Sequence, residues 1–146
     1  MMNITILPFE ALDLDTFYEI LALRSDVFIV EQACFYQDLD FKDQHAMHLQ
    51  IREDDRLIGY ARILPYDDHA MSFGRIVTAP SHRGQGLGKQ LMEIILGFLG
   101  NHYPERPITI TAQNYLHDFY QGYGFNAQGE PFDMDGIPHI TMVKQP

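Results

Sequence analysis

The stretch that decides the fold is Ile76-Val-Thr-Ala-Pro-Ser-His-Arg-Gly-Gln-Gly-Leu-Gly-Lys89. It begins as a strand, passes through a glycine-rich loop and opens an amphipathic helix. A junction of this kind leaves several backbone N–H groups unpaired at the positive end of a helix dipole, which suits a phosphate or pyrophosphate. Arg83 and Lys89 add positive charge. The sequence therefore predicts an anion site at the start of this helix.

Two common phosphate-binding patterns do not fit the loop. A Walker A loop needs glycine at the place of Arg83 and serine or threonine at the place of Gln90. The dinucleotide pattern G-x-G-x-x-G finds Gly84 and Gly86, but Lys89 stands where its last glycine belongs. Nucleotide binding of these two kinds is therefore not expected.

The pattern that does fit is Arg-x-x-Gly-x-Gly, at Arg83, Gly86 and Gly88. It resembles the loop that holds the pyrophosphate of acetyl-CoA in the GNAT superfamily of N-acetyltransferases. The structural alternative is a flexible loop that only caps the helix. A second stretch, Phe119-Tyr-Gln-Gly-Tyr-Gly-Phe125, resembles the Tyr-x-x-x-Gly-Phe segment that closes the cofactor site of the same superfamily. Two motifs in the right order identify the chain as a GNAT-like acetyltransferase.

The resemblance implies roles for particular residues. The strand that enters the loop would hold the pantetheine and the thioester carbonyl on its exposed amides. Gln113 stands where many members carry an asparagine that contacts the cofactor arm. Tyr120 is the candidate catalytic acid, because a phenol near pKa 10 can protonate a departing thiolate; packing beside Phe119 is the structural alternative. The cofactor-binding candidates are Ile76, Val77, Thr78, Arg83, Gly84, Gln85, Gly86, Leu87, Gly88, Lys89 and Gln113.

A closer resemblance covers nearly the whole chain. The segments Arg24–Gln32, Asp38–Asp40, Gly74–Val77 and Gly136–His139 resemble the ElaA-like branch of GNAT proteins. This implies an α/β (α+β) fold with a mixed, mostly antiparallel central sheet of about seven strands and helices on both faces. The front part of the chain is also similar to acyl-homoserine-lactone synthases, which share the fold.

Hydrophobic periodicity predicts elements in the order β, α(α), β, β, β, α, β, α, β, β. One long helix or two short ones are expected from Asp13 to about Glu31, followed by an acidic loop over 33–44. Asp54-Asp55 and Asp135-Gly136 predict hairpin turns. Asn114 is expected to cap a short helix that runs to Tyr120.

The acceptor side of the site is less well defined. Glu31 is a candidate base or amine-binding group, with a solvated helix-end carboxylate as the alternative. Arg62 and Arg75, on neighbouring predicted strands, are candidates for binding an acidic acceptor group, or for ion pairs with the aspartates of the loop over 38–43. Ser72 stands where histone-acetylating members carry glutamate, so a histone-type mechanism is not expected.

Composition narrows the class of protein. The chain has 146 residues, so one domain over 1–146 is expected. The net charge is −10, which argues against nucleic acid binding. No apolar run is long enough for a membrane span, and the single cysteine, Cys34, fits a cytoplasmic protein. His45 and His48 are expected to face opposite sides of a strand, so no metal site is predicted.

Together these features predict an acetyltransferase that uses acetyl-CoA as cosubstrate. The acceptor would be the amine of a small molecule or a peptide, and transfer would be direct, within a ternary complex. One alternative is a catalytically weak CoA-binding regulatory module. A second is an acyltransferase that depends on acyl carrier protein. The protein is expected to be a monomer or a homodimer.

Overall fold

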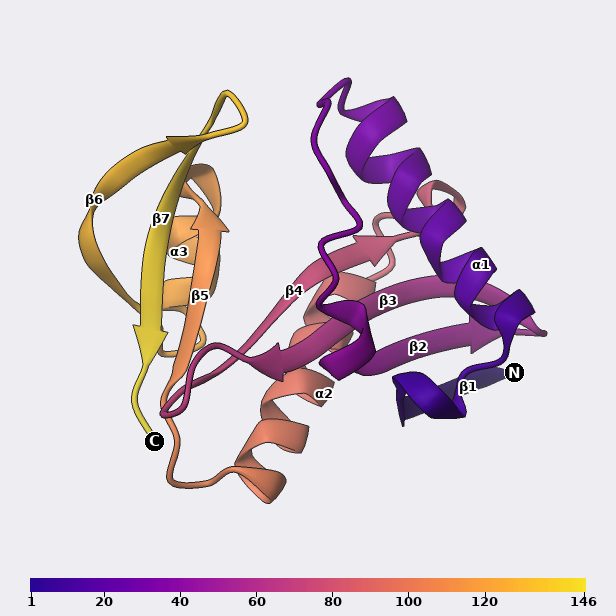
Figure 1. The fold of residues 1–146 in the computed structure, drawn as a ribbon, viewed down its shortest axis with the longest axis horizontal. Helices are drawn as coiled ribbons and strands as arrows, with labels where there is room; N and C mark the ends of the chain where they lie inside the picture. Colours follow the sequence, from indigo (N-terminus) through magenta and orange to yellow (C-terminus); the bar gives the residue numbers. More distant parts are fainter. The chain divides into compact units, whose positions relative to one another are not determined.

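The computed structural model describes residues 1–146, and Figure 1 shows their fold. Seven strands form one hydrogen-bonded sheet in the order β1-β2-β3-β4-β5-β7-β6, and three α-helices flank it. The pairs β1–β2, β2–β3, β5–β7 and β6–β7 are antiparallel, and β4 and β5 pair in parallel. The prediction of a mixed, mostly antiparallel sheet of about seven strands is therefore confirmed.

The elements follow the predicted order along the chain. The strands are β1 (Met2–Pro8), β2 (Met47–Glu53), β3 (Arg56–Pro65), β4 (Met71–Thr78), β5 (Ile108–Gln113), β6 (Asn126–Met134) and β7 (Ile137–Lys144). The α-helices are α1 (Leu14–Arg24), α2 (Leu87–His102) and α3 (His117–Gln121). Short helices of other types are η1 (Phe9–Ala11), η2 (Ser25–Glu31), η3 (Asp43–His45), η4 (Pro80–His82) and η5 (Asn114–Leu116).

The chain divides into two compact units, which are described in turn. The first comprises 1–64 and 73–98, and the second comprises 65–72 and 99–146. One domain over the whole chain therefore stays a prediction.

In the first unit, two helices cover opposite faces of the strands. Tyr60 on β3 lies in one apolar cluster with Ile20 of α1, while a side chain added at the preceding residue, Gly59, would contact Leu91 of α2. Successive residues of a strand point to opposite faces, so α1 lies on one face and α2 on the other (Figure 1). This arrangement buries both faces of β2 and β3.

The first helical region is continuous but changes its type. Asp13 caps α1 by accepting a hydrogen bond from the Thr16 amide at 2.7 Å. From Ser25 to Glu31 the helix is of the π type, with hydrogen bonds five residues apart, from Cys34 N–H to Ile29 O at 3.2 Å for example. The predicted helix is thus one run, but its wider second half was not predicted.

The second unit is built on the pairing of β5 with β7 and of β7 with β6. The β6–β7 turn has Asp135 at φ 53° and Gly136 at φ 81°, and the β2–β3 turn has two aspartates at positive φ. Both predicted hairpin turns are therefore confirmed, with the left-handed backbone that two-residue hairpins favour.

The predicted role of Asn114 as a helix cap is wrong. Asn114 begins the 3₁₀ turn η5, and α3 begins only at His117, with Leu116 at its cap position and no side-chain capping bond. The tighter turn moves the helix cap by two residues, from the predicted Asn114 to Leu116.

Replacement of Leu91 by alanine tests the packing of α2. Leu91 is fully buried, so we expect the free energy of unfolding to fall by about 2–5 kcal/mol, because the lost side chain leaves a cavity. Urea denaturation measures the change. The control is Glu93→Ala, an exposed position on the same helix, where a change within about 0.5 kcal/mol is expected. Equal effects of the two substitutions would contradict this packing.

Candidate active site

The glycine-rich loop before α2 has the backbone expected of an anion site. Gly84 and Gly86 lie at φ 78° and 77°, which only glycine adopts without strain. The first hydrogen bond of the helix runs from Gln90 N–H to Gly86 O at 3.0 Å. The amides from Gly86 to Lys89 therefore have no partner inside the helix. Their N–H groups and the helix dipole together favour a negative ligand.

Gly88 differs from Gly84 and Gly86. Its φ is not positive, and a side-chain carbon added there would meet no atom of the chain within 4 Å. Neither the backbone nor the packing of the protein thus requires glycine at this position. An open face on the first turn of the helix leaves room for close approach of a ligand, so the residues present fit a pyrophosphate.

Arg83 of the loop has a partner within the first unit. Its Nη2 lies 2.6 Å from Oε1 of Glu31, at the end of η2, and both side chains are about half exposed. Glu31 therefore contacts the proposed cofactor loop directly.

The strand that leads into the loop is irregular at Arg75. This residue lies at φ 51°, a conformation that costs about 1–2 kcal/mol for a residue with a side chain. Val77, two residues further, is buried in one cluster with Val27 of η2. The predicted contact of the Ile76–Thr78 amides with a thioester stays a prediction.

Two of the predicted site residues, Gln113 and Tyr120, lie in the second unit. Tyr120 on α3 is buried, with its ring centroid 6.0 Å from that of Phe125. Burial, with a smaller contribution from Tyr115, raises the pKa of Tyr120 to about 12, so the phenol keeps its proton at neutral pH. Gln113 ends β5 opposite His139 of β7. The structure thus divides the candidates between the two units.

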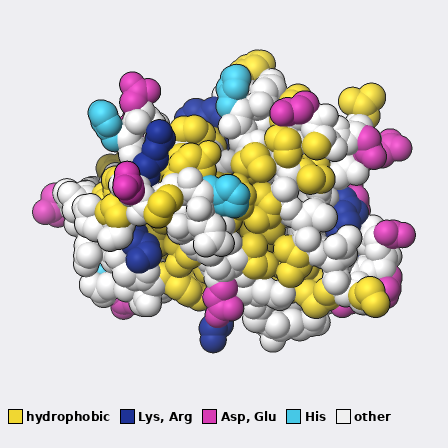
Figure 2. Space-filling model, turned by 90° about the horizontal axis from the view of Figure 1, so that it is seen from below, with side chains coloured by type: hydrophobic (Ala, Val, Ile, Leu, Met, Phe, Trp, Pro, Cys, Tyr) yellow, Lys and Arg dark blue, Asp and Glu magenta, His cyan; other side chains and the backbone are white.

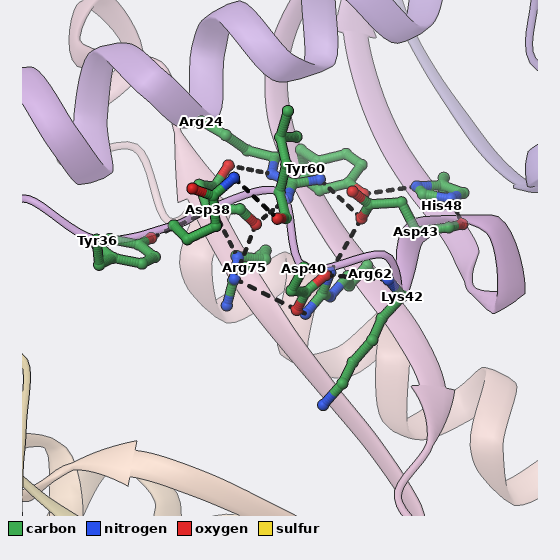
Figure 3. A network of polar contacts seen from close by, with 12 residues as sticks. Arg24, Tyr36, Asp38, Asp40, Lys42, Asp43, His48, Tyr60, Arg62 and Arg75 are labelled. Carbon is green, nitrogen blue, oxygen red and sulfur yellow. Dashed lines mark hydrogen bonds and ion pairs between the residues drawn. The ribbon is translucent and has the colours of Figure 1, made fainter.

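A network of ion pairs joins α1, the following loop, β3 and β4 within the first unit (Figure 3). Arg24 is fully buried, and its Nε and Nη1 lie 3.0 Å from Asp38 and 2.9 Å from Asp43. Arg62 binds Asp43 at 3.0 Å. It also holds Asp40 through both terminal nitrogens, at 2.8 and 2.5 Å.

Arg75 completes the network from β4. Its Nε donates to Oδ1 of Asp38 at 2.7 Å, and its guanidinium lies 5.6 Å from the centre of the Tyr36 ring. Three guanidinium groups thus face three carboxylates, so their formal charges cancel. Arg62 and Arg75 were proposed either to bind an acidic acceptor group or to pair with these aspartates. The structure contains the ion pairs.

The network also shifts the pKa values of its members. Burial alone would raise the pKa of Asp40, but the hydrogen bonds and charge of Arg62 hold it well below its usual range. Burial would lower the pKa of Arg62, but its bonds with Asp40 and Asp43 raise it instead. Asp40 and Arg62 therefore both stay charged at neutral pH.

His48 and Tyr60 form the buried edge of the network and were missed by the sequence reasoning. The His48 Nε2 lies 2.9 Å from the Asp43 carbonyl oxygen, which only accepts, so Nε2 carries the proton. Nδ1 then accepts from the Tyr60 hydroxyl at 2.6 Å. Burial lowers the pKa of His48; Asp43 opposes this shift, and Arg24 and Arg62 add to it, so the pKa lies below its usual value. His48 is therefore a neutral, structural histidine.

Other features of the surface bear on ligand class. His45 lies on η3, not on a strand, and no group of three or more His, Cys, Asp or Glu side chains is arranged to hold a metal ion. None of the helices has both the length and the apolar character that a membrane crossing requires. On the face drawn in Figure 2, basic and acidic side chains are interspersed, and no basic patch forms there.

Comparison with known proteins gives the family. Residues 18–146 match the family model of the acetyltransferase (GNAT) domain. The protein ElaA of Escherichia coli is 39% identical over 138 residues, which cover 92% of this chain and 90% of ElaA. The chain therefore belongs to the GNAT acetyltransferase family.

Solved structures agree with this assignment. The crystal structure of E. coli ElaA has a TM-score of 0.92 and 37% identity, covering 99% of this chain and 100% of ElaA. An acyl-CoA N-acyltransferase from Pseudomonas aeruginosa has a TM-score of 0.94 and 36% identity, over 99% of both chains. A GNAT family acetyltransferase from Elizabethkingia anophelis with acetyl-CoA bound shares the fold, with a TM-score of 0.66 and 20% identity over 99% of both chains.

Acid should destabilise the protein through His48. Its pKa is lowered from 6.5 in the folded state, so the unfolded chain binds the proton first as the pH falls. The stability that His48 contributes is complete above pH 6.5 and is lost below it, at up to about 1.4 kcal/mol per pH unit. Asp40 acts with the same sign at lower pH, beginning near 3.8.

The measurement is the free energy of unfolding between pH 7.5 and 5. We expect His48→Gln to flatten this dependence and His45→Gln, at an exposed position, to keep it. A slope that is the same in the wild type and in His48→Gln would exclude His48 as its source.

Proposed function

We propose that this protein transfers an acetyl group from acetyl-CoA, as cosubstrate, to the amine of a small molecule or a peptide. Transfer is direct, in a ternary complex, and residues 1–146 act as one domain in the cytoplasm. The observation that carries the proposal is the loop before α2, where Gly84, Gly86 and Gly88 leave unpaired amides and open space beside Arg83. The acetyl-CoA bound to the Elizabethkingia protein of the same fold supports the choice of ligand.

Each group of candidates has a role in this proposal. The amides from Gly86 to Lys89 and the Arg83 guanidinium bind the pyrophosphate. The amides of Ile76–Thr78 hold the pantetheine and stabilise the negative charge on the carbonyl oxygen. Gln113 contacts the cofactor arm. In the reaction the carbon–sulfur bond of the thioester breaks and a carbon–nitrogen bond forms. Tyr120 gives its proton to the departing thiolate, and the proton that the amine loses passes through water and restores that of Tyr120.

Glu31 is not free to act as a general base while it pairs with Arg83. We therefore assign it to the cofactor loop, as a carboxylate that competes with pyrophosphate for the guanidinium. Water or a group of the acceptor would then carry off the proton of the amine. A regulatory CoA-binding module remains the alternative, because Ser72 replaces the glutamate of the histone-acetylating members.

Calorimetric titration of acetyl-CoA, compared with acetyl-pantetheine, tests the loop. We expect acetyl-CoA to bind at least tenfold more tightly, since only acetyl-CoA carries the pyrophosphate. Gly88→Ala should weaken acetyl-CoA binding by a similar factor, because the added methyl group fills the space left for the ligand. The same change should leave the free energy of unfolding unchanged or raise it by up to about 1 kcal/mol, because alanine favours helix.

Glu31→Gln is expected to change acetyl-CoA affinity in the opposite direction to Gly88→Ala. Removing the competing carboxylate should raise acetyl-CoA affinity by up to about fivefold, the range that an exposed ion pair allows. Absence of acetyl-CoA binding in the wild type would overturn the proposed function at its first step. Equal binding of the two ligands would show that the loop does not hold pyrophosphate.

Tyr120→Phe tests the catalytic acid. We expect the turnover number to fall by about 10²–10⁴-fold, the range of general acid catalysis, while acetyl-CoA affinity stays within about twofold. CoA release in the presence of an accepted amine measures the turnover. The control is Tyr123→Phe, a hydroxyl removed from the turn that follows α3. Unchanged turnover in Tyr120→Phe would leave its hydroxyl with a structural role alone.

A further inference from the structure

A pocket of about 230 Å³ lies within the first unit, between the first helical region and the loop that follows it. Leu21, Ser25 and Ile29 line it from the helical side, and 36–39 line it from the loop. Its volume is below the roughly 300–1,000 Å³ of sites for drug-sized ligands, so it suits one ring or a branched chain.

The π-helix determines which side chains face this pocket. Helices of this type are rare and occur frequently at functional sites. Ser25 and Ile29 of η2 line the pocket, whereas Val27, between them, is buried in the core. The same short element thus forms a wall of the pocket, packs on the core and ends at Glu31, which binds the loop before α2.

The pocket lies next to the strand proposed to hold the thioester. Asp38, a lining residue, accepts a hydrogen bond from Arg75 at 2.7 Å, and Arg75 directly precedes Ile76. Val27 of η2 and Val77 of β4 share one apolar cluster. The pocket is therefore connected to β4 through the Asp38–Arg75 hydrogen bond, one residue before the Ile76–Thr78 amides.

The charges around the pocket are already neutralised. Both carboxylate oxygens of Asp38 are engaged, Oδ1 by Arg75 and Tyr36 and Oδ2 by Arg24. The terminal nitrogens of Arg24 are bound as well, to Asp43 and to the Asp38 carbonyl. Every side-chain nitrogen of Arg24 therefore already has a partner. The other lining side chains carry no charge: Leu21, Ile29 and Leu39 are apolar, and Ser25, Tyr36 and Gln37 are polar.

The apolar part of the lining reaches the surface at Leu39, which is 46% exposed. An acceptor with a hydrocarbon body would bury this side chain as well as its own surface, at about 25 cal/mol for each Å². An acceptor with a carboxylate would lose the hydration of that group without a charged partner.

We propose that this pocket holds the apolar body of the acetyl acceptor. The acceptor class is a primary amine on an aromatic or branched hydrocarbon group, with no carboxylate beside the amine. This inference rests on the proposed acetyl transfer, and it excludes free amino acids as preferred acceptors.

Three amines test the chemistry of the pocket: 2-phenylethylamine, ethylamine and phenylalanine. Binding to the protein saturated with CoA is measured by NMR titration, which needs no turnover. We expect 2-phenylethylamine to bind at least tenfold more tightly than the other two. In the CoA-release assay, its kcat/KM should exceed theirs by the same factor. Equal binding of all three amines, or tighter binding of phenylalanine, would overturn the proposal.

Two variants locate the binding. Ser25→Phe fills the pocket from an exposed lining position and should weaken 2-phenylethylamine binding at least tenfold. Ala22→Phe places the same ring at an exposed position of α1 outside the lining, and should change it less than twofold. Thermal unfolding and acetyl-CoA titration show whether both variants are folded. Equal weakening by both variants, or by neither, would overturn the assignment to this pocket.

The experiments distinguish an error in the pocket proposal from an error in the proposed acetyl transfer. If acetyl-CoA binds but none of the amines does, the pocket proposal is overturned and the cofactor loop stands. If 2-phenylethylamine binds in a Ser25-dependent way but acetyl-CoA does not bind, the pocket stands and acetyl transfer is overturned.

Discussion

Arg24 lies at the end of α1 with no exposed surface, and two carboxylates from the next part of the chain bind its guanidinium. A buried charge without partners would cost several kcal/mol, so α1 is held in place only if the loop brings Asp38 and Asp43 to it. The loop in turn has little other structure between 32 and 42. The position of this loop, and of the pocket it lines, therefore depends on the buried Arg24 guanidinium, together with those of Arg62 and Arg75.

The same loop is tied to the sheet by Arg75, at the place where β4 is irregular. A left-handed backbone at this residue costs about 1–2 kcal/mol, and its bonds with Asp38 offset that cost. The irregularity of β4 and the arrangement of the acidic loop are thus linked. The segment proposed to hold a thioester, Ile76–Thr78, begins one residue later. Arg75 therefore connects the acidic loop, on the proposed acceptor side, to the proposed thioester segment.

The sequence predicts local features well and the network poorly. The α2 helix, the loop before it and both hairpin turns follow from neighbouring residues, and all lie where they were expected. The ion pairs join residues 14–37 positions apart, so no spacing rule identifies them. The π-type turns of η2 also leave no signal, since their apolar pattern resembles that of an α-helix. Alternation along β2 predicted a strand, but not that its polar face, with His48 and Gln50, is buried beneath α1.

The ion pair between Glu31 and Arg83 affects how strongly anion binding by the loop depends on ionic strength. An anion that binds a bare guanidinium loses affinity as salt screens the attraction. Here an arriving anion displaces a carboxylate, and salt weakens the old pair as well as the new one. The two effects partly cancel, so Arg83 contributes less salt dependence to anion binding than its charge alone suggests. The half-exposed carboxylate of Glu31 thus reduces the change in anion affinity of the loop when the salt concentration changes.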